Sequence, residues 1–214
     1  MSNLRSNSRV IYPFTGVLRV PKKKSVKLAA QAFADNVKEV QGFFKGTEGL
    51  NDAYKQWCAD YAIIRLYLEF EVLMLKAIVG AVNSDTDTLF QSSGVKFPKH
   101  LSEDVCTYLV VGTGYFDFKG RDGLLKTLRK FVPKTHYLYK IIKSSKYKDA
   151  LEQLTALRNF AAHNSKSAKK IALTATKSTK IGSAGSWLRV QNRFEGLTIL
   201  LIDLSKKIRH AAPY

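Results

Sequence analysis

The sequence predicts an all-α protein, organised as an antiparallel helical bundle, and three observations support this fold class. Apolar side chains recur at steps of three and four residues in several long segments, which is the spacing of an amphipathic helix. The segment 51–82 is apolar nearly all round, which is typical of a central, buried helix. The chain has 214 residues, of which 45% are hydrophobic, and this length and composition are ample for a hydrophobic core.

Residues 1–26 are expected to form a basic N-terminal arm that precedes a single helical domain over residues 27–214. Within the arm, residues 10–20 consist of two apolar runs around Pro13 and Gly16. This pattern fits either a short hairpin or an extended arm, because proline and glycine interrupt regular structure.

Two helices are predicted to follow the arm. Residues 27–44 carry apolar side chains at helical steps, and Gly46 and Gly49 end that helix. The long helix over residues 51–82 has Asp52 in its first turn, where a carboxylate interacts favourably with the helix dipole. We expect this long helix at the centre of the bundle.

The middle of the chain contains segments of different character. Residues 83–100 contain aspartate, glycine and proline and are predicted to be a loop. Residues 101–118 have an alternating, β-branched centre, which fits either a strand or a bent helix. Three further helices are predicted over residues 123–132, 134–144 and 147–163.

Residues 164–186 are predicted to be an exposed loop insertion before the last helix. They are rich in serine, threonine, alanine, glycine and lysine, and they lack a periodic pattern of large apolar residues. The last helix is predicted to run from about residue 187 or 192 to residue 208, with an apolar stripe made mostly of leucines.

The net charge is strongly positive and unevenly distributed. The chain has 35 lysines and arginines against 17 acidic residues, which gives a formal charge of +18. Residues 119–214 carry 21 basic and 5 acidic side chains, a net of +16. Because self-repulsion of this size opposes compaction, we expect a polyanionic partner.

Several classes of protein and site are excluded. Cys58 and Cys106 are far apart and form no CxxC pair, which argues against a disulfide scaffold or a cysteine zinc site and favours a reducing compartment. No two histidines have metal-ligand spacing, so neither a metal nor another cofactor is expected. The most apolar run, residues 72–82, contains Lys76 and is too short to span a bilayer. We therefore expect a cytoplasmic protein without a membrane partner.

The segment from Arg158 to Ser165 carries the residues most suited to chemistry. Arg158 and His163 lie five positions apart at the end of an apolar helix. Asn159 and His163 are neighbours on one helical face, because they are four positions apart. Asn164 and Ser165 are poor helix formers, so His163 is expected at the helix C-terminus with its ring exposed.

An arginine and a histidine in this arrangement suit the cleavage of RNA without a metal ion. Histidine, with an ordinary pKa near ~6.5, can take the proton from a ribose 2′-hydroxyl or give one to the leaving 5′-oxygen. Arginine can hold the phosphate with two hydrogen bonds and stabilise the charge of the transition state. The alternative is structural: a surface histidine and an arginine that pairs with an ordinary carboxylate.

The stretch RNFAAH, residues 158–163, resembles the R-x4-6-H signature of the HEPN superfamily, in which a polar residue, often asparagine, follows the arginine. The resemblance implies a helical bundle of HEPN type in which Arg158, Asn159 and His163 are catalytic. It also implies a homodimer that forms a composite active site, and a toxin or antiviral defence effector with an antitoxin or defence-system partner protein. Ser165 stands where one branch of the superfamily carries a tyrosine.

An acidic residue on an earlier helix faces the motif in many members of this superfamily, and Glu71 is the candidate here. The helical neighbours of Glu71 are large and mostly apolar, so its carboxylate is expected to point inward and to need a partner. We expect Glu71 to orient Arg158; pairing with another residue of the bundle is the alternative. Glu69, near Arg65 and Lys76 on the same helix, is expected on a partly exposed, ion-paired face.

Five lysines follow the motif and are expected to bind RNA phosphates: Lys166, Lys169, Lys170, Lys177 and Lys180. The alternative is a solvated, lysine-rich loop. The sequence therefore predicts a metal-independent endoribonuclease. The alternative function is a non-catalytic module of HEPN type that binds nucleic acid or docks a partner.

Overall fold

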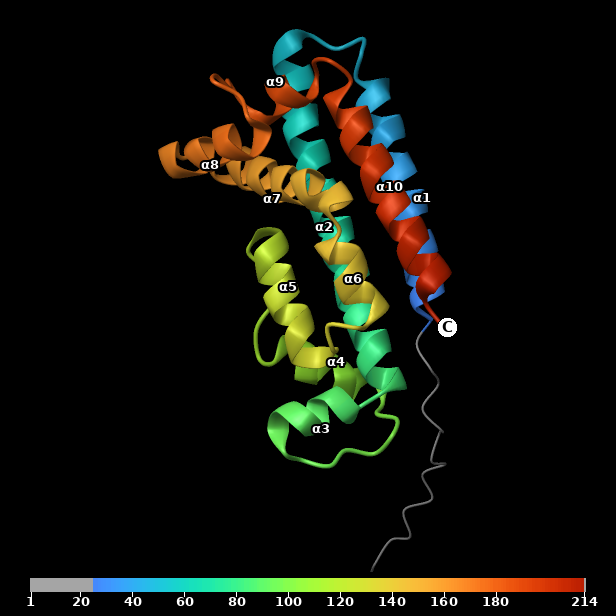
Figure 1. The fold of residues 1–214 in the computed structure, drawn as a ribbon. Coiled ribbons are helices and arrows are strands. Elements are labelled where there is room, and N and C mark those ends of the chain that lie inside the picture. The colour runs from blue at the N-terminus through green and yellow to red at the C-terminus, as the bar shows by residue number, and fades with distance from the viewer. Residues whose placement is uncertain (1–24, 214) are drawn as a thin grey trace, which may run out of the picture.

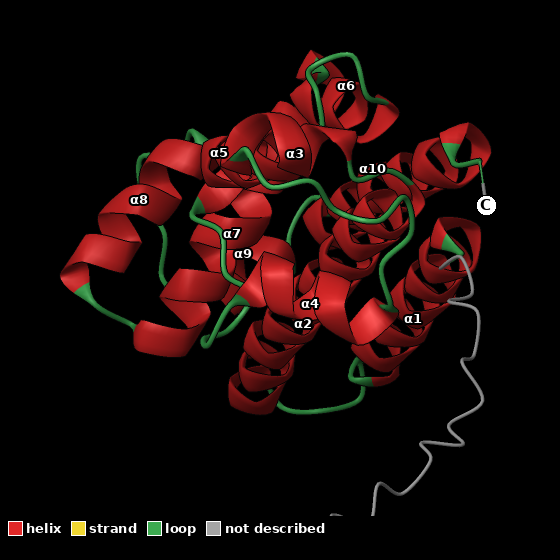
Figure 2. Ribbon diagram, turned by 90° about the horizontal axis from the view of Figure 1, so that it is seen from below, coloured by secondary structure: helices red, strands yellow, loops and turns green. Residues whose placement is uncertain are grey.

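The computed structural model describes residues 25–213, and every regular element in that range is a helix (Figure 1, Figure 2). The predicted all-α class is confirmed for these residues. The predicted arm, residues 1–26, lies almost entirely outside them. The helices are α1 (Val26–Gly46), α2 (Asp52–Ser84), α3 (Asp87–Ser93), α4 (Glu103–Val111), α5 (Gly120–Phe131), α6 (Tyr137–Lys143), the 3₁₀ turn η1 (Ser145–Tyr147), α7 (Lys148–His163), α8 (Lys166–Thr176), α9 (Ala184–Leu188) and α10 (Arg193–Ala211).

Helix α2 lies at the centre of the fold, as its apolar composition predicts. Asn51 caps the helix, because its side-chain oxygen accepts a hydrogen bond from the Tyr54 backbone N–H at 2.9 Å. Side chains along its middle, such as Ile63, Leu66 and Phe70, are fully buried. Helix α2 packs against α1, α4, α7 and α9, so it supports most of the other elements directly.

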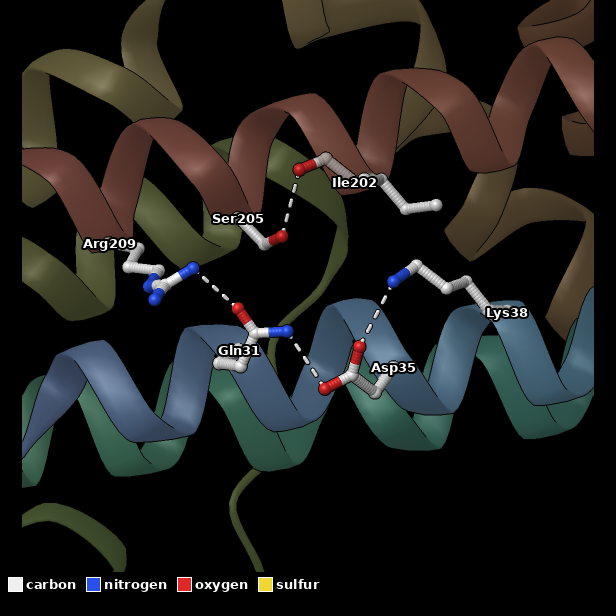
Figure 3. Close-up of polar contacts among 6 residues, drawn as sticks. All are labelled: Gln31, Asp35, Lys38, Ile202, Ser205 and Arg209. Carbon is white, nitrogen blue, oxygen red and sulfur yellow. Dashed lines mark hydrogen bonds and ion pairs between the residues drawn. The ribbon is translucent and has the colours of Figure 1, made fainter.

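Helix α1 packs on α2 and runs antiparallel to α10. At one end Arg209 donates a hydrogen bond to Gln31 at 2.5 Å, and Gln31 donates to Asp35 at 2.8 Å (Figure 3). At the other end the rings of Phe44 and Phe194 stack with their centroids 4.1 Å apart. Early residues of α1 therefore pair with late residues of α10, and the first and last described helices close the bundle on each other.

Two short helices lie where the sequence predicted a loop or left the choice open. Residues 83–100 contain α3, which ends at Gly94 in the left-handed conformation, φ +68°. The loop prediction was therefore wrong over α3. Residues 101–118 contain α4 and no strand, because Ser102 caps the first turn by accepting from the Val105 N–H at 3.3 Å.

The predicted loop insertion over residues 164–186 was wrong over most of its length, because this segment contains α8 and the start of α9. Ser165 caps α8 by accepting a hydrogen bond from the Ala168 N–H at 3.1 Å. Ala168, Ala172 and Thr176 are buried and recur every four residues, and α8 packs against α7. The stripe consists of small side chains, so a search for large apolar residues does not find it.

The backbone of α9 lies almost against α2. Asp60 accepts a hydrogen bond from the Gly185 N–H at 2.6 Å, and a Cβ atom on Gly185 would lie 2.4 Å from the Gln56 carbonyl oxygen. Burial raises the pKa of the Asp60 carboxyl, and the hydrogen bond from Gly185 opposes this shift. The contact attaches the connection between α8 and α10 to the central helix.

Candidate active site

Helix α7 carries the arginine–histidine pair and ends where the sequence predicts. His163 is its last residue and is exposed, and Asn164 follows in the left-handed conformation, φ +43°. The Asn164 N–H donates to the Phe160 carbonyl oxygen at 3.0 Å, which closes the last turn. The His163 imidazole therefore lies at a helix C-terminus with access to solvent.

A cavity of about 770 Å³ lies between α7, α8 and the segment that leads into α5. Arg158, Asn159 and His163 line it from α7, and Lys170 lines it from α8. Helices α7 and α8 are consecutive in the chain and lie side by side (Figure 1), so they form neighbouring walls. Four of the residues predicted from the sequence thus share one cavity.

The Arg158 guanidinium is held against the central helix. Its Cζ lies 5.0 Å from the centre of the Tyr67 ring, within cation–π distance. Its Nη1 donates a hydrogen bond to the Asn159 side-chain oxygen at 2.9 Å. Its Nε is buried and has no hydrogen-bond partner among the described residues. A buried donor without a partner carries a free-energy cost, so this orientation of Arg158 is maintained by its other contacts.

The expected ion pair between Glu71 and Arg158 is not formed among the described residues. Glu71 is only half-buried, and its carboxylate interacts electrostatically with the guanidinium without pairing with it. Tyr67, one turn earlier on α2, carries the guanidinium over its ring instead. Burial raises the pKa of Glu71, Arg158 opposes this shift, and Asp117 adds to it.

The buried carboxylate of α2 belongs to Glu69. It is 7% exposed and pairs with Arg65 at 2.5 Å, and Asn36 of α1 donates a hydrogen bond to it at 2.5 Å. The ion pair predicted for this face is confirmed. The predicted partial exposure of Glu69 was wrong, because the hydrogen bond from Asn36 places α1 against its carboxylate. Glu69 joins α1 to α2 and does not line the cavity.

The cavity residues that sequence reasoning missed include Tyr67, Asp117 and Glu152. The Tyr67 hydroxyl donates to the Phe118 carbonyl oxygen at 3.3 Å, which ties the segment before α5 to α2. Burial raises the pKa of Tyr67, and the carboxylates of Glu71 and Asp117 raise it further, so the hydroxyl stays protonated. The four-residue spacing between Tyr67 and Glu71 was the signal in the sequence that linked this tyrosine to the site.

The five lysines after the motif do not gather in the cavity. Lys170 lines it. Lys177 instead forms an ion pair with Asp149 at 2.6 Å, which links the end of α8 to the start of α7. Three others are exposed and do not line the cavity: Lys166, Lys169 and Lys180. The cationic loop expected to deliver RNA phosphates is thus helical over Lys166–Thr176, and it places one of the five lysines in the cavity.

Residues 25–213 contain neither a metal-binding cluster nor a membrane-spanning helix. No group of three or more histidine, cysteine or acidic side chains in that range is placed to hold a metal ion. No helix in that range is both long enough and apolar enough to cross a membrane.

No protein-family model matches the chain, and no curated protein or solved structure matches it either.

Proposed function

We propose that the protein is a metal-independent endoribonuclease of HEPN type that acts as a defence or toxin effector in the cytoplasm. The observation that carries the proposal is the shared cavity. Arg158, Asn159 and His163 all line it, and the His163 ring is exposed there. Side chains that line one cavity can act on one phosphate group.

In the proposed reaction the 2′-oxygen of a ribose attacks the adjacent phosphorus, and the bond from phosphorus to the 5′-oxygen breaks. His163 takes the proton from the 2′-hydroxyl or gives a proton to the departing 5′-oxygen. Arg158 stabilises the charge on the oxygens of the pentacoordinate phosphorus. The products are a 2′,3′-cyclic phosphate and a 5′-hydroxyl.

One histidine cannot easily be both the base and the acid in the same turnover. A homodimer that pairs two cavities across a two-fold axis would supply a second imidazole and a second guanidinium. The proposed partners are therefore RNA, a second copy of the chain, and an antitoxin or other defence-system protein that restrains the activity. The net charge of +18 supports a polyanionic substrate.

The test is incubation of total cellular RNA with wild type and with His163→Ala in the presence of EDTA. We expect wild type to leave 2′,3′-cyclic phosphate ends, and His163→Ala to lose activity by about a hundredfold or more. His210→Ala is the matched control, because His210 is also an exposed histidine in the last turn of a helix. Full activity in His163→Ala would contradict the proposal.

A second function is favoured by the way Arg158 is held. Its guanidinium lies on Tyr67 and bonds to Asn159, which also suits a structural arginine in a non-catalytic module that binds nucleic acid or docks a partner. That function predicts salt-sensitive RNA binding without turnover, and an Arg158→Ala protein that is mainly destabilised. RNA cleavage by wild type but not by His163→Ala would exclude it.

A further inference from the structure

The cavity extends well beyond the arginine–histidine pair, along the hairpin of α7 and α8. The turn at Asn164 joins the near ends of these helices, and the Lys177–Asp149 ion pair joins their far ends. His163 lines the near end of the cavity, and Glu152 lines its far part. At a helical rise of 1.5 Å per residue, these two positions lie about 16 Å apart along α7.

The middle of the cavity offers an apolar surface. Ile171 of α8 lines it and is 53% exposed, so this side chain is not taken up by the core. Thr155 and Thr174 line it from the two helices. Their hydroxyls donate to carbonyl oxygens of their own helices, Thr155 to Leu151 and Thr174 to Lys170, each at 3.1 Å. With both hydroxyls engaged, this part of the wall suits a flat, largely apolar group.

Charged side chains of both signs line the cavity. Arg158 lies five positions before His163 and six after Glu152 on α7, and it lines the cavity together with Lys170 and Lys119. At the far part, no hydrogen bond or ion pair with a described residue engages the Glu152 carboxylate, which interacts with the Lys177 ammonium only electrostatically. A phosphate is therefore attracted to Arg158 and Lys170, whereas the acceptor oxygens of Glu152 favour a neutral group with N–H donors.

We propose that this cavity is a base-selective subsite for one nucleotide of single-stranded RNA. The phosphate lies near Arg158 and His163, the base lies on Ile171, and Glu152 accepts a hydrogen bond from the exocyclic amino group of the base. The class of substrate rests on the proposed function. A carboxylate accepts from the amino group of cytosine and repels the carbonyl oxygens of uracil, so the subsite favours a base with an amino group over uracil.

Binding to short RNA tests the subsite without requiring cleavage. The probes are oligocytidine and oligouridine of equal length in EDTA, and the parent protein is His163→Ala, so that both probes stay intact. We expect oligocytidine to bind about tenfold more tightly than oligouridine, and Glu152→Gln to reduce this ratio to about one. Equal affinities for the two probes in the parent protein would overturn the inference.

The apolar middle is tested by Ile171→Glu, with Ile199→Glu as the matched control. Ile199 of α10 is 54% exposed and does not line the cavity, so both changes add one carboxylate at an equally exposed isoleucine. We expect Ile171→Glu to weaken oligocytidine binding by about tenfold or more, and Ile199→Glu to change it by less than about twofold. If both variants weaken oligocytidine binding equally, the change in overall charge explains the loss, and the inference is overturned.

Thr174→Arg is a second variant, which fills the cavity while adding positive charge. Overall charge alone predicts tighter RNA binding by this variant, whereas a filled subsite predicts weaker binding of oligocytidine. Tighter binding would therefore overturn the inference. A wild-type protein that fails to cleave RNA while these binding differences persist would refute the proposed function and leave the subsite standing.

Discussion

The Arg158 guanidinium lies over the ring of Tyr67, with its Cζ 5.0 Å from the ring centre. The two residues belong to α7 and α2, and each makes a second contact. Arg158 bonds to Asn159, and the Tyr67 hydroxyl bonds to the Phe118 carbonyl oxygen. One aromatic ring therefore orders both the arginine and the segment that lines another wall of the cavity, which makes Tyr67 a positioning residue for the proposed reaction.

Tyr67→Phe and Tyr67→Leu separate the roles of the hydroxyl and the ring. Phenylalanine keeps the ring, so we expect a loss of about 1 kcal/mol in the free energy of unfolding and little change in RNA cleavage. Leucine also loses the cation–π surface, so we expect a further loss of about 1–3 kcal/mol and about tenfold slower cleavage. Urea unfolding and cleavage of total RNA measure the two effects. Equal cleavage by the two variants would contradict the positioning role.

Glu71 makes the stability depend on pH. Burial is the main cause that raises its pKa above the ordinary value of 4.5, so the folded protein binds this proton more readily than the unfolded chain. The resulting stabilisation is complete below the unfolded pKa and is lost as the pH rises through the raised, folded pKa. We therefore expect Glu71→Gln to have a higher Tm than wild type at pH 7 and a similar Tm at acidic pH. A lower Tm for Glu71→Gln at pH 7 would show that the attraction between Arg158 and the Glu71 carboxylate exceeds the free-energy cost of burying that carboxylate.

Gly185→Ala tests the close approach of α9 to α2. The added Cβ would lie 2.4 Å from the Gln56 carbonyl oxygen and 3.1 Å from the Ala59 Cβ, so α9 would have to shift. We expect a loss of about 1–3 kcal/mol in the free energy of unfolding. Gly196→Ala is the matched control, because Gly196 lies within α10 with open space around it, and alanine there should stabilise by about 0.5–1 kcal/mol. Similar free energies of unfolding for the two variants would contradict the close approach of Gly185 to α2.

The left-handed conformation of Asn164 gives a further test. At φ +43° an alanine is penalised by about 1–2 kcal/mol, whereas a glycine is not. We expect Asn164→Ala to lower the free energy of unfolding by about 1 kcal/mol and Asn164→Gly to leave it nearly unchanged. Because this turn follows His163 directly, Asn164→Ala should also lower kcat for RNA cleavage. Thermal unfolding and cleavage kinetics of the pair provide the measurement, and a more stable alanine variant would refute the left-handed turn.

Local patterns predicted most of the helices, because apolar spacing and capping act over a few residues. The helix predicted over residues 51–82 is α2, and the one over 147–163 is α7, with ends that differ by at most two residues. The exposed His163 at the end of α7 followed from Asn164 and Ser165, whose side chains favour helix ends over helix interiors.

The remaining features depend on packing between segments that are distant in the chain. Glu69 and Glu71 lie two positions apart, and the position of Asn36 on α1 decides which carboxylate is buried and paired. The contact between Arg158 and Tyr67 joins α7 to α2, and no local pattern specifies it. Helix α8 was missed for another reason, since its buried stripe of alanine and threonine is too weakly apolar to give a periodic signal.

The pairing of α1 with α10 has a consequence for the biosynthesis of the chain. Helix α1 leaves the ribosome before α10, so the ring of Phe44 meets its stacking partner, Phe194, only when the last described helix has been synthesised. A product that stops before α10 leaves one side of α1 uncovered, with apolar surface open to aggregation. We therefore expect truncated translation products to be cleared without acquiring a native site, so that only a chain synthesised through α10 reaches the folded state.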